Sequence, residues 1–159
     1  MEKLLENMKT VYQAEGILQK NFVGQISYTV CLEQKYEELD IEFSYDKQRY
    51  TKEDITPELL EELRSVCREK YDLELSDEEI ENLAYKIMKT EIHTLASLND
   101  TFIGCVHRQL PVRHMHFTPQ WATEGCIPQS SVEGVLKITV LVFHVLLDQT
   151  HYTLKVSVR

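Results

Sequence analysis

The chain has 159 residues, of which 43% are hydrophobic and 27% are charged. This length fits one domain with a substantial core, and the composition is that of a folded protein rather than a disordered one. The formal net charge of −9 disfavours binding to nucleic acid. Only two basic residues other than histidine, Arg108 and Arg113, lie in the acid-free stretch 105–121. We therefore expect a single domain over residues 1–159 that does not bind nucleic acid.

The cysteines and the apolar segments bear on the cellular compartment. The spacing of Cys31, Cys67, Cys105 and Cys126 matches no compact disulfide framework, and we expect the first two to be small buried residues. The N-terminus carries acidic residues and lacks the apolar run of a signal peptide. The longest apolar run, 138–147, is too short to cross a bilayer. These features predict a cytoplasmic protein that is not embedded in a membrane.

The first part of the chain predicts one helix followed by two strands. Apolar residues at helical spacing over 2–19 predict the helix. The spacing changes to every second residue in 22–34 and again in 39–45, which is typical of half-buried strands. Because only the polar link 35–38 separates these strands, we expect them to form an antiparallel hairpin with one wet face.

The middle of the chain predicts two helices with clear start signals. Thr56 is a favourable N-cap, and Pro57 suits the first position of a helix that runs to residue 71. Ser76 and Glu79 match a capping box at the start of the second helix. Apolar residues at helical spacing extend this second helix to residue 98, and the pair 99–100 ends it.

The last part of the chain predicts mainly strands. Residues 101–117 read as extended, with Pro111 either separating two strands or kinking one. A loop follows over 118–134. Strands over 135–147 and 151–159 then predict a second hairpin.

The predicted fold class is α+β, with an antiparallel sheet of four to six strands built from two hairpins and three helices packed mainly on one face. Residues 138–147 are apolar on both faces of the predicted strand. We therefore expect this strand to be central, covered by helices on one side and by a partner or a second layer on the other.

One stretch of the sequence gathers residues that bind metals. Cys105 and His107 are two residues apart, as are His114 and His116, so each pair shares one face of a strand. If the pairs face each other, Cys126 adds a fifth ligand, and such a set suits Zn²⁺. No acidic residue lies in 102–123 to orient the imidazoles, and the same residues are equally compatible with ordinary strand positions.

The remaining candidates are binding residues rather than catalytic ones. The sequence contains no phosphate-binding glycine loop, no metalloprotease motif and no nucleophile elbow. Trp121 in the long loop is either a plug at the end of the core or an anchor for a partner, and Arg108, Arg113 and the apolar-strand residue His144 complete the predicted binding set. We expect a non-catalytic binding or interaction domain without a cofactor, whose partner is a protein or a small apolar ligand and which is able to form a homodimer. The alternative is a zinc-binding protein or zinc-dependent enzyme that uses the cysteine and histidine stretch.

Overall fold

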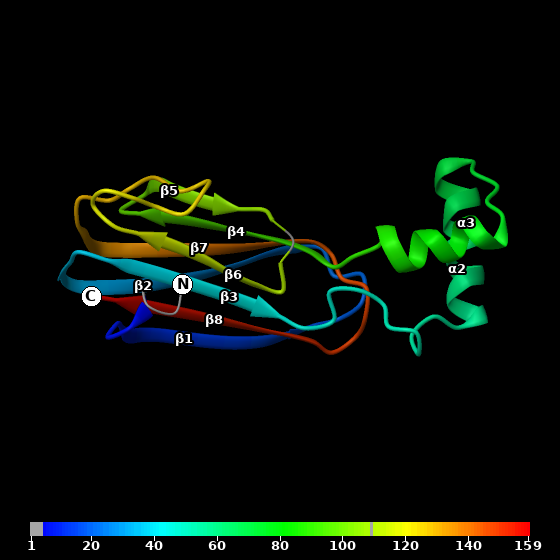
Figure 1. Ribbon diagram of the computed structural model, residues 1–159, viewed down its shortest axis with the longest axis horizontal. Helices are drawn as coiled ribbons and strands as arrows, with labels where there is room; N and C mark the ends of the chain where they lie inside the picture. The colour runs from blue at the N-terminus through cyan, green and yellow to red at the C-terminus, as the bar shows by residue number, and fades with distance from the viewer. Residues whose placement is uncertain (1–4, 109) are drawn as a thin grey trace.

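The computed structural model describes residues 5–108 and 110–159, and its main body is a sandwich of two four-stranded antiparallel sheets (Figure 1). Sheet A has the strand order β1-β8-β3-β6, and sheet B has the order β2-β7-β4-β5. The strands are β1 (Lys9–Leu18), β2 (Gly24–Tyr36), β3 (Leu39–Tyr45), β4 (Glu91–Leu98), β5 (Thr101–Val106), β6 (Val112–Phe117), β7 (Val132–His144) and β8 (Thr150–Val158).

The predicted single sheet with helices on its face is wrong, and so are both predicted hairpins. Strands β2 and β3 lie in different sheets, as do β7 and β8, so each short link crosses from one layer to the other. The link before β3 is held by the backbone of Arg159, which exchanges hydrogen bonds with Glu38. Alternation of apolar and polar residues shows that one face of a strand is buried, but it does not show which sheet the strand joins.

The predicted N-terminal helix is also wrong, because residues 9–18 form β1. This strand pairs with β8 along its whole length, with a bulge between Thr10 and Tyr12. The bulge disturbs the alternation of inward and outward residues, so the apolar spacing resembles that of a helix. Gly16 lies against the Tyr152 ring and leaves space for it. Pairing with β8 therefore decides the local structure.

The helix predicted over residues 76–98 ends early. It consists of α3 (Asp77–Asn82) and a π-helix, η1 (Leu83–Ile87), and β4 begins at residue 91. Within β4 every second side chain is buried, from Ile92 to Leu98. Asn99 and Asp100 both have positive φ angles, of 50° and 65°, and they form the turn of the β4–β5 hairpin.

The predicted helix starts are confirmed. Thr56 caps α2 (Pro57–Tyr71), and Ser76 and Glu79 form both bonds of a capping box. The helices lie beyond one end of the sandwich rather than on a sheet (Figure 1). We call residues 51–90, which connect β3 to β4, the helical unit. It has a small core with neighbouring residues of the sandwich end: Tyr50, Leu63, Cys67, Ile80, Ala84 and Leu146.

The main core lies between the two sheets. Its largest fully buried side chains include Phe43 and Phe117, each of which stabilises the fold by roughly 1.5–3 kcal/mol through burial. β7 is central in sheet B, as predicted, but sheet A covers its inner side and no helix of the described chain covers its outer side. No helix in the described part of the chain is long and apolar enough to cross a membrane.

The segment 118–131 covers the edge of the sandwich that is formed by β5 and β6. Its backbone bonds to Cys105 and Ile103 of β5 and to His116 of β6. Edge strands β5 and β6 therefore expose fewer unpaired backbone groups to other chains.

Candidate functional site

The cysteine and histidine stretch is divided between the two sheets. Cys105 and His107 lie at the end of β5 in sheet B, and His114 and His116 lie on β6 in sheet A. Cys126 lies next to β5, where its backbone bridges Gly104. In the described chain, no three His, Cys, Asp or Glu side chains form a group that could hold a metal ion. The zinc role of this set stays a prediction, and elemental analysis of untagged protein is the measurement that tests it.

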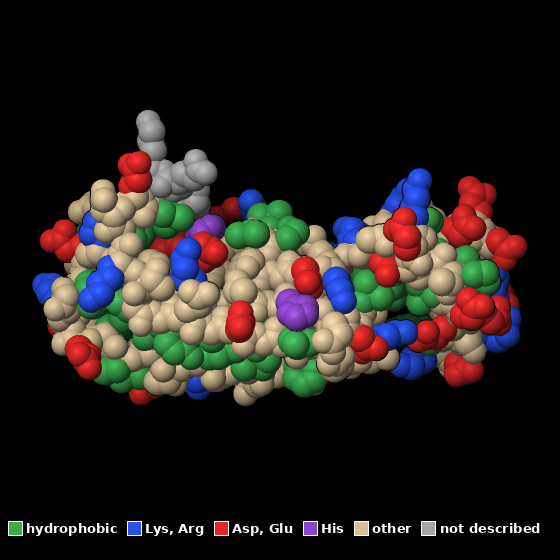
Figure 2. Space-filling model, turned by 90° about the horizontal axis from the view of Figure 1, so that it is seen from below, with side chains coloured by type: hydrophobic (Ala, Val, Ile, Leu, Met, Phe, Trp, Pro, Cys, Tyr) green, Lys and Arg blue, Asp and Glu red, His purple; other side chains and the backbone are tan. Residues whose placement is uncertain are grey.

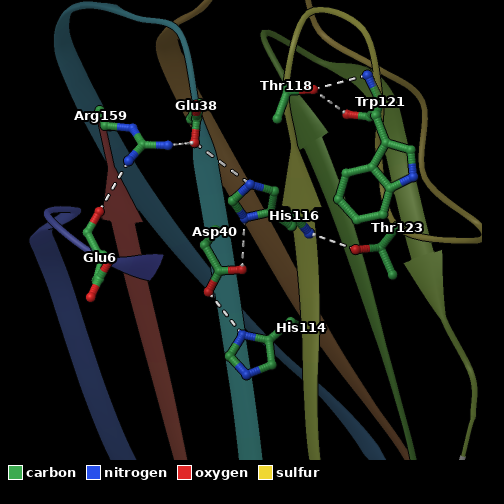
Figure 3. A network of polar contacts seen from close by, with 9 residues as sticks. All are labelled: Glu6, Glu38, Asp40, His114, His116, Thr118, Trp121, Thr123 and Arg159. Atoms are coloured by element: carbon green, nitrogen blue, oxygen red, sulfur yellow. Dashed lines mark hydrogen bonds and ion pairs between the residues drawn. The ribbon is translucent and has the colours of Figure 1, made fainter. Parts of the chain in front are cut away.

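The two histidines of β6 instead contact an aspartate from β3, which the sequence did not indicate. His114 Nδ1 lies 2.9 Å from one carboxylate oxygen of Asp40, and His116 Nδ1 lies 3.2 Å from the other (Figure 3). A single carboxylate therefore bridges two imidazoles on the outer face of sheet A.

The contacts continue from both imidazoles to further charged residues. His116 Nε2 lies 3.7 Å from Glu38, whose carboxylate accepts a hydrogen bond of 2.6 Å from Arg159. On the other side, His114 Nε2 lies 4.0 Å from Glu42, which is 3.1 Å from the ammonium group of Lys155. Basic and acidic groups thus alternate along one line, which we call the charge ladder: Arg159, Glu38, His116, Asp40, His114, Glu42 and Lys155.

Strand register explains why these residues meet. Asp40 is directly opposite His116, and Glu42 is opposite both His114 on β6 and Lys155 on β8. Side chains two residues apart on a strand share a face, so β3 presents a row of carboxylates between a row of imidazoles and a row of cations. The matching spacing of 40/42 and 114/116 was the one available sequence signal, but it does not say which strands pair.

Burial makes the ladder energetically important. Asp40 is 1% exposed and His116 is fully buried, and buried charges need hydrogen-bonded partners. The hydrogen bond from His114 to Asp40 raises the pKa of His114 above its ordinary value, although partial burial acts in the opposite direction. His116 Nε2 has no hydrogen-bond partner within the described residues. This nitrogen faces the carboxylate of Glu38.

Trp121 lies beside the buried end of the ladder, in a loop held by hydrogen bonds. Its ring lies 5.9 Å from the ring of His116, and it is 47% exposed (Figure 3). The Thr118 hydroxyl donates to the Trp121 carbonyl at 2.8 Å and accepts from the Trp121 amide at 2.9 Å. The Thr123 hydroxyl accepts the backbone N–H of His116. Trp121 therefore packs one side of its ring near His116 and leaves about half of its surface exposed.

The ladder lacks the parts of a nucleophilic catalytic site. Such a site needs an imidazole with one nitrogen toward a carboxylate and the other toward a nucleophile. Here each nitrogen of His114 and of His116 faces a carboxylate. Burial also raises the pKa of the Cys105 thiol, and that of Cys126 to about 11, so both are poor nucleophiles at neutral pH.

The other predicted binding residues lie at separate positions. Arg108 is exposed and forms an ion pair with Glu124. Arg113 is buried between the sheets, with its guanidinium over the rings of Phe43 and Tyr45 at 5.2 and 5.5 Å. Burial lowers the pKa of Arg113. His144 ends β7, and burial lowers its pKa. The structure therefore does not combine the predicted set Trp121, Arg108, Arg113 and His144 into one site.

Comparison with known proteins gives a family but no described activity. Residues 8–159 match a family of unknown function (DUF6669). No curated protein matches the chain. No solved structure matches it either.

We predict that the ladder makes stability depend on pH through His114. A histidine with a raised pKa in the folded state stabilises the fold fully below its unfolded value of about 6.5, and this contribution is lost as the pH rises through the folded value. The free energy of unfolding in urea should therefore fall as the pH increases above about 6.5. His114→Gln should flatten this slope, whereas His151→Gln, at an exposed histidine, should leave it unchanged. Equal slopes in wild type and His114→Gln would contradict the assignment.

We further predict that Asp40→Asn destabilises the protein by about 3–5 kcal/mol, because it leaves two partly or fully buried imidazoles without their charged partner. The matched control is Glu15→Gln at an exposed carboxylate on β1, which should change stability by less than about 0.5 kcal/mol. Urea unfolding followed by circular dichroism measures both. A cost for Asp40→Asn no larger than that of the control would show that the carboxylate does not hold the ladder together.

Proposed function

The chain belongs to this family of unknown function, and we propose that it is a non-catalytic interaction domain that binds a second copy of itself through the outer face of sheet B. We define this outer face as the side chains of β2, β7, β4 and β5 that point away from sheet A. The observation that carries the proposal is that this face holds several exposed apolar side chains and that no described element covers it.

Apolar side chains on this face lie in water where a partner could bury them. Val135 and Phe143 of β7 are 48% and 50% exposed, and Phe102 of β5 is 50% exposed. Leu141 and Leu95 lie between them and are half-buried. His93 stacks on Phe143 with ring centroids 4.6 Å apart, which extends the flat surface. Exposed apolar side chains gathered on one face are typical of interaction sites.

The distribution of charge favours a second copy as the occupant. Between Val135 and Phe143 of β7, the outer-facing residues of β7 and of their partners on β2 and β4 are neutral except for Lys137. By contrast, the helical unit holds twelve of the 26 acidic residues. Two copies with a net charge of −9 therefore repel each other least when they approach through sheet B.

Two charged residues of this face, Lys137 and Glu91, are also complementary to each other. Lys137 lies near the middle of β7, and Glu91 lies beside one end of that strand, opposite His144. A two-fold axis near Leu141, midway between these two residues, places Lys137 of one copy near Glu91 of the other. Contacts related in this way occur twice in a symmetric dimer, so each contributes twice.

We predict that the wild-type protein is a dimer with twice the chain mass of 18.7 kDa and that Phe143→Glu is a monomer. A charge at this position would be buried without a partner in the dimer. Ile17→Glu is the matched control, because Ile17 is 49% exposed but lies on β1 of sheet A. Light scattering after size exclusion, from micromolar to millimolar concentration, measures the mass. A wild type that stays monomeric throughout would overturn the proposal.

A charge-reversal pair tests the two-fold arrangement itself. Lys137→Glu should weaken the dimer, since it places two acidic groups near each other. Combining it with Glu91→Lys should restore the affinity, because the opposite charges then meet again. If the double variant is no tighter than Lys137→Glu alone, the copies do not pair in this orientation.

A further inference from the structure

The helical unit contains a groove that neither the sandwich core nor the outer face of sheet B uses. It has a volume of about 890 Å³ and runs along α3 and η1. Its apolar lining comes from Leu75, Leu83, Tyr85 and Ile87, and three glutamates line it as well: Glu78, Glu79 and Glu81.

The π-helix explains why apolar side chains line an open groove. In a continuous α-helix Ile87 would lie two turns after Ile80 and on the same buried face. Ile80 is fully buried, but Ile87 is 59% exposed. The wide turn of η1 rotates Ile87 outward, as shown by the bond of 2.9 Å from Met88 N–H to the Leu83 carbonyl. π-Turns inside helices are frequent at functional sites.

The acidic residues of the groove divide into bound and free carboxylates. Glu79 is used by the capping box with Ser76. Glu78 and Glu81 are exposed and form no hydrogen bond or ion pair within the described residues. Lys86 is the single lysine or arginine among the lining residues. The groove therefore offers an apolar surface with free negative charge at its margin.

The helical unit around the groove also carries an excess of negative charge. Figure 2 shows acidic side chains gathered around hydrophobic ones at the helical end, more densely than over the sandwich. Within the helical unit, twelve acidic residues face six lysines and arginines. This excess repels acidic chains and anionic lipid surfaces, and it attracts basic segments from a distance.

We propose that this groove binds a basic amphipathic segment of a partner protein. Apolar side chains of the segment pack between Tyr85 and Ile87, and its lysines or arginines pair with Glu78 and Glu81. An amphipathic helix in an apolar groove is an established mode of peptide recognition, and the partner's basic charge follows from the free carboxylates. This surface is separate from sheet B, so the inference holds whether or not the chain dimerises.

The first test uses designed peptides as probes. A fluorescent peptide of leucine and lysine at helical spacing should bind the full chain. A peptide with serine in place of leucine has the same charge and should bind at least about tenfold more weakly, since a tenfold loss already corresponds to roughly one buried leucine side chain. A third peptide, of leucine and glutamate, should not bind. Equal binding of the serine and leucine peptides would mean that charge attraction alone is at work and would overturn the proposal, as would binding of the acidic peptide.

Matched variants locate the binding surface. Glu78→Gln with Glu81→Gln removes two free carboxylates at the groove, whereas Glu53→Gln with Glu58→Gln removes two exposed carboxylates elsewhere on the helical unit. The first pair should weaken binding of the leucine–lysine peptide several-fold, and the second should leave it unchanged. Equal weakening by both pairs would contradict a site at this groove.

A measurement on the wild-type protein does not depend on the folding of any variant. Backbone amide shifts in nuclear magnetic resonance spectra should change on peptide addition at Leu75, Tyr85 and Ile87. Changes confined to sheet B or to the loop of Trp121 would place the peptide elsewhere and overturn the proposal.

Discussion

Asp40 imposes the strictest physical constraint on sheet A. Its carboxylate is almost completely buried on the outer side of the sheet, away from the apolar core, where an isolated charge would be costly. The two imidazoles of β6 offset this cost only if β6 lies in one particular register beside β3, since a slip by one residue would move both histidines to the other face. The buried charge therefore fixes the position of an edge strand, and His116 in turn holds the loop that carries Trp121.

The sequence alone was sufficient to predict elements that depend on residues close together in the chain, such as helix starts and alternating strands. The caps at Thr56 and Ser76 depend on residues three positions apart, and both are present as predicted. The alternation in β2, β3 and β8 was equally clear. By contrast, β1 and β4 are strands because they pair with β8 and β7, and their apolar spacing also fits a helix. The same limit applies to the two layers, because a link of a few residues can either form a hairpin or cross between sheets.

The same limit applies to the charge ladder: its residues were visible in the sequence, but the contact between them was not. The row of histidines in β6 was visible in the sequence, and so was the row of acidic residues in β3. Their contact depends on a pairing over 76 residues of chain, which one sequence does not reveal. Zinc binding was the alternative interpretation of the cysteine and histidine stretch, because the carboxylate partners of the histidines were not evident in the sequence. The structure adds Asp40 between the two imidazoles as a partner that they share.

Folded proteins normally expose charged side chains and bury apolar ones. The outer face of sheet A, the outer face of sheet B and the groove of the helical unit each depart from this rule, but only sheet A compensates for the departure. Sheet A places charges in a buried setting, and each carboxylate of the ladder has a basic or imidazole neighbour. Sheet B and the groove of the helical unit instead expose apolar side chains: Phe143 and Ile87 face water, and no described element covers them. Consistency among local choices is what makes a sequence fold, so uncompensated exceptions tend to mark binding sites. The ladder is therefore best understood as part of the framework, and the uncovered apolar surfaces are the places where we propose that partners bind.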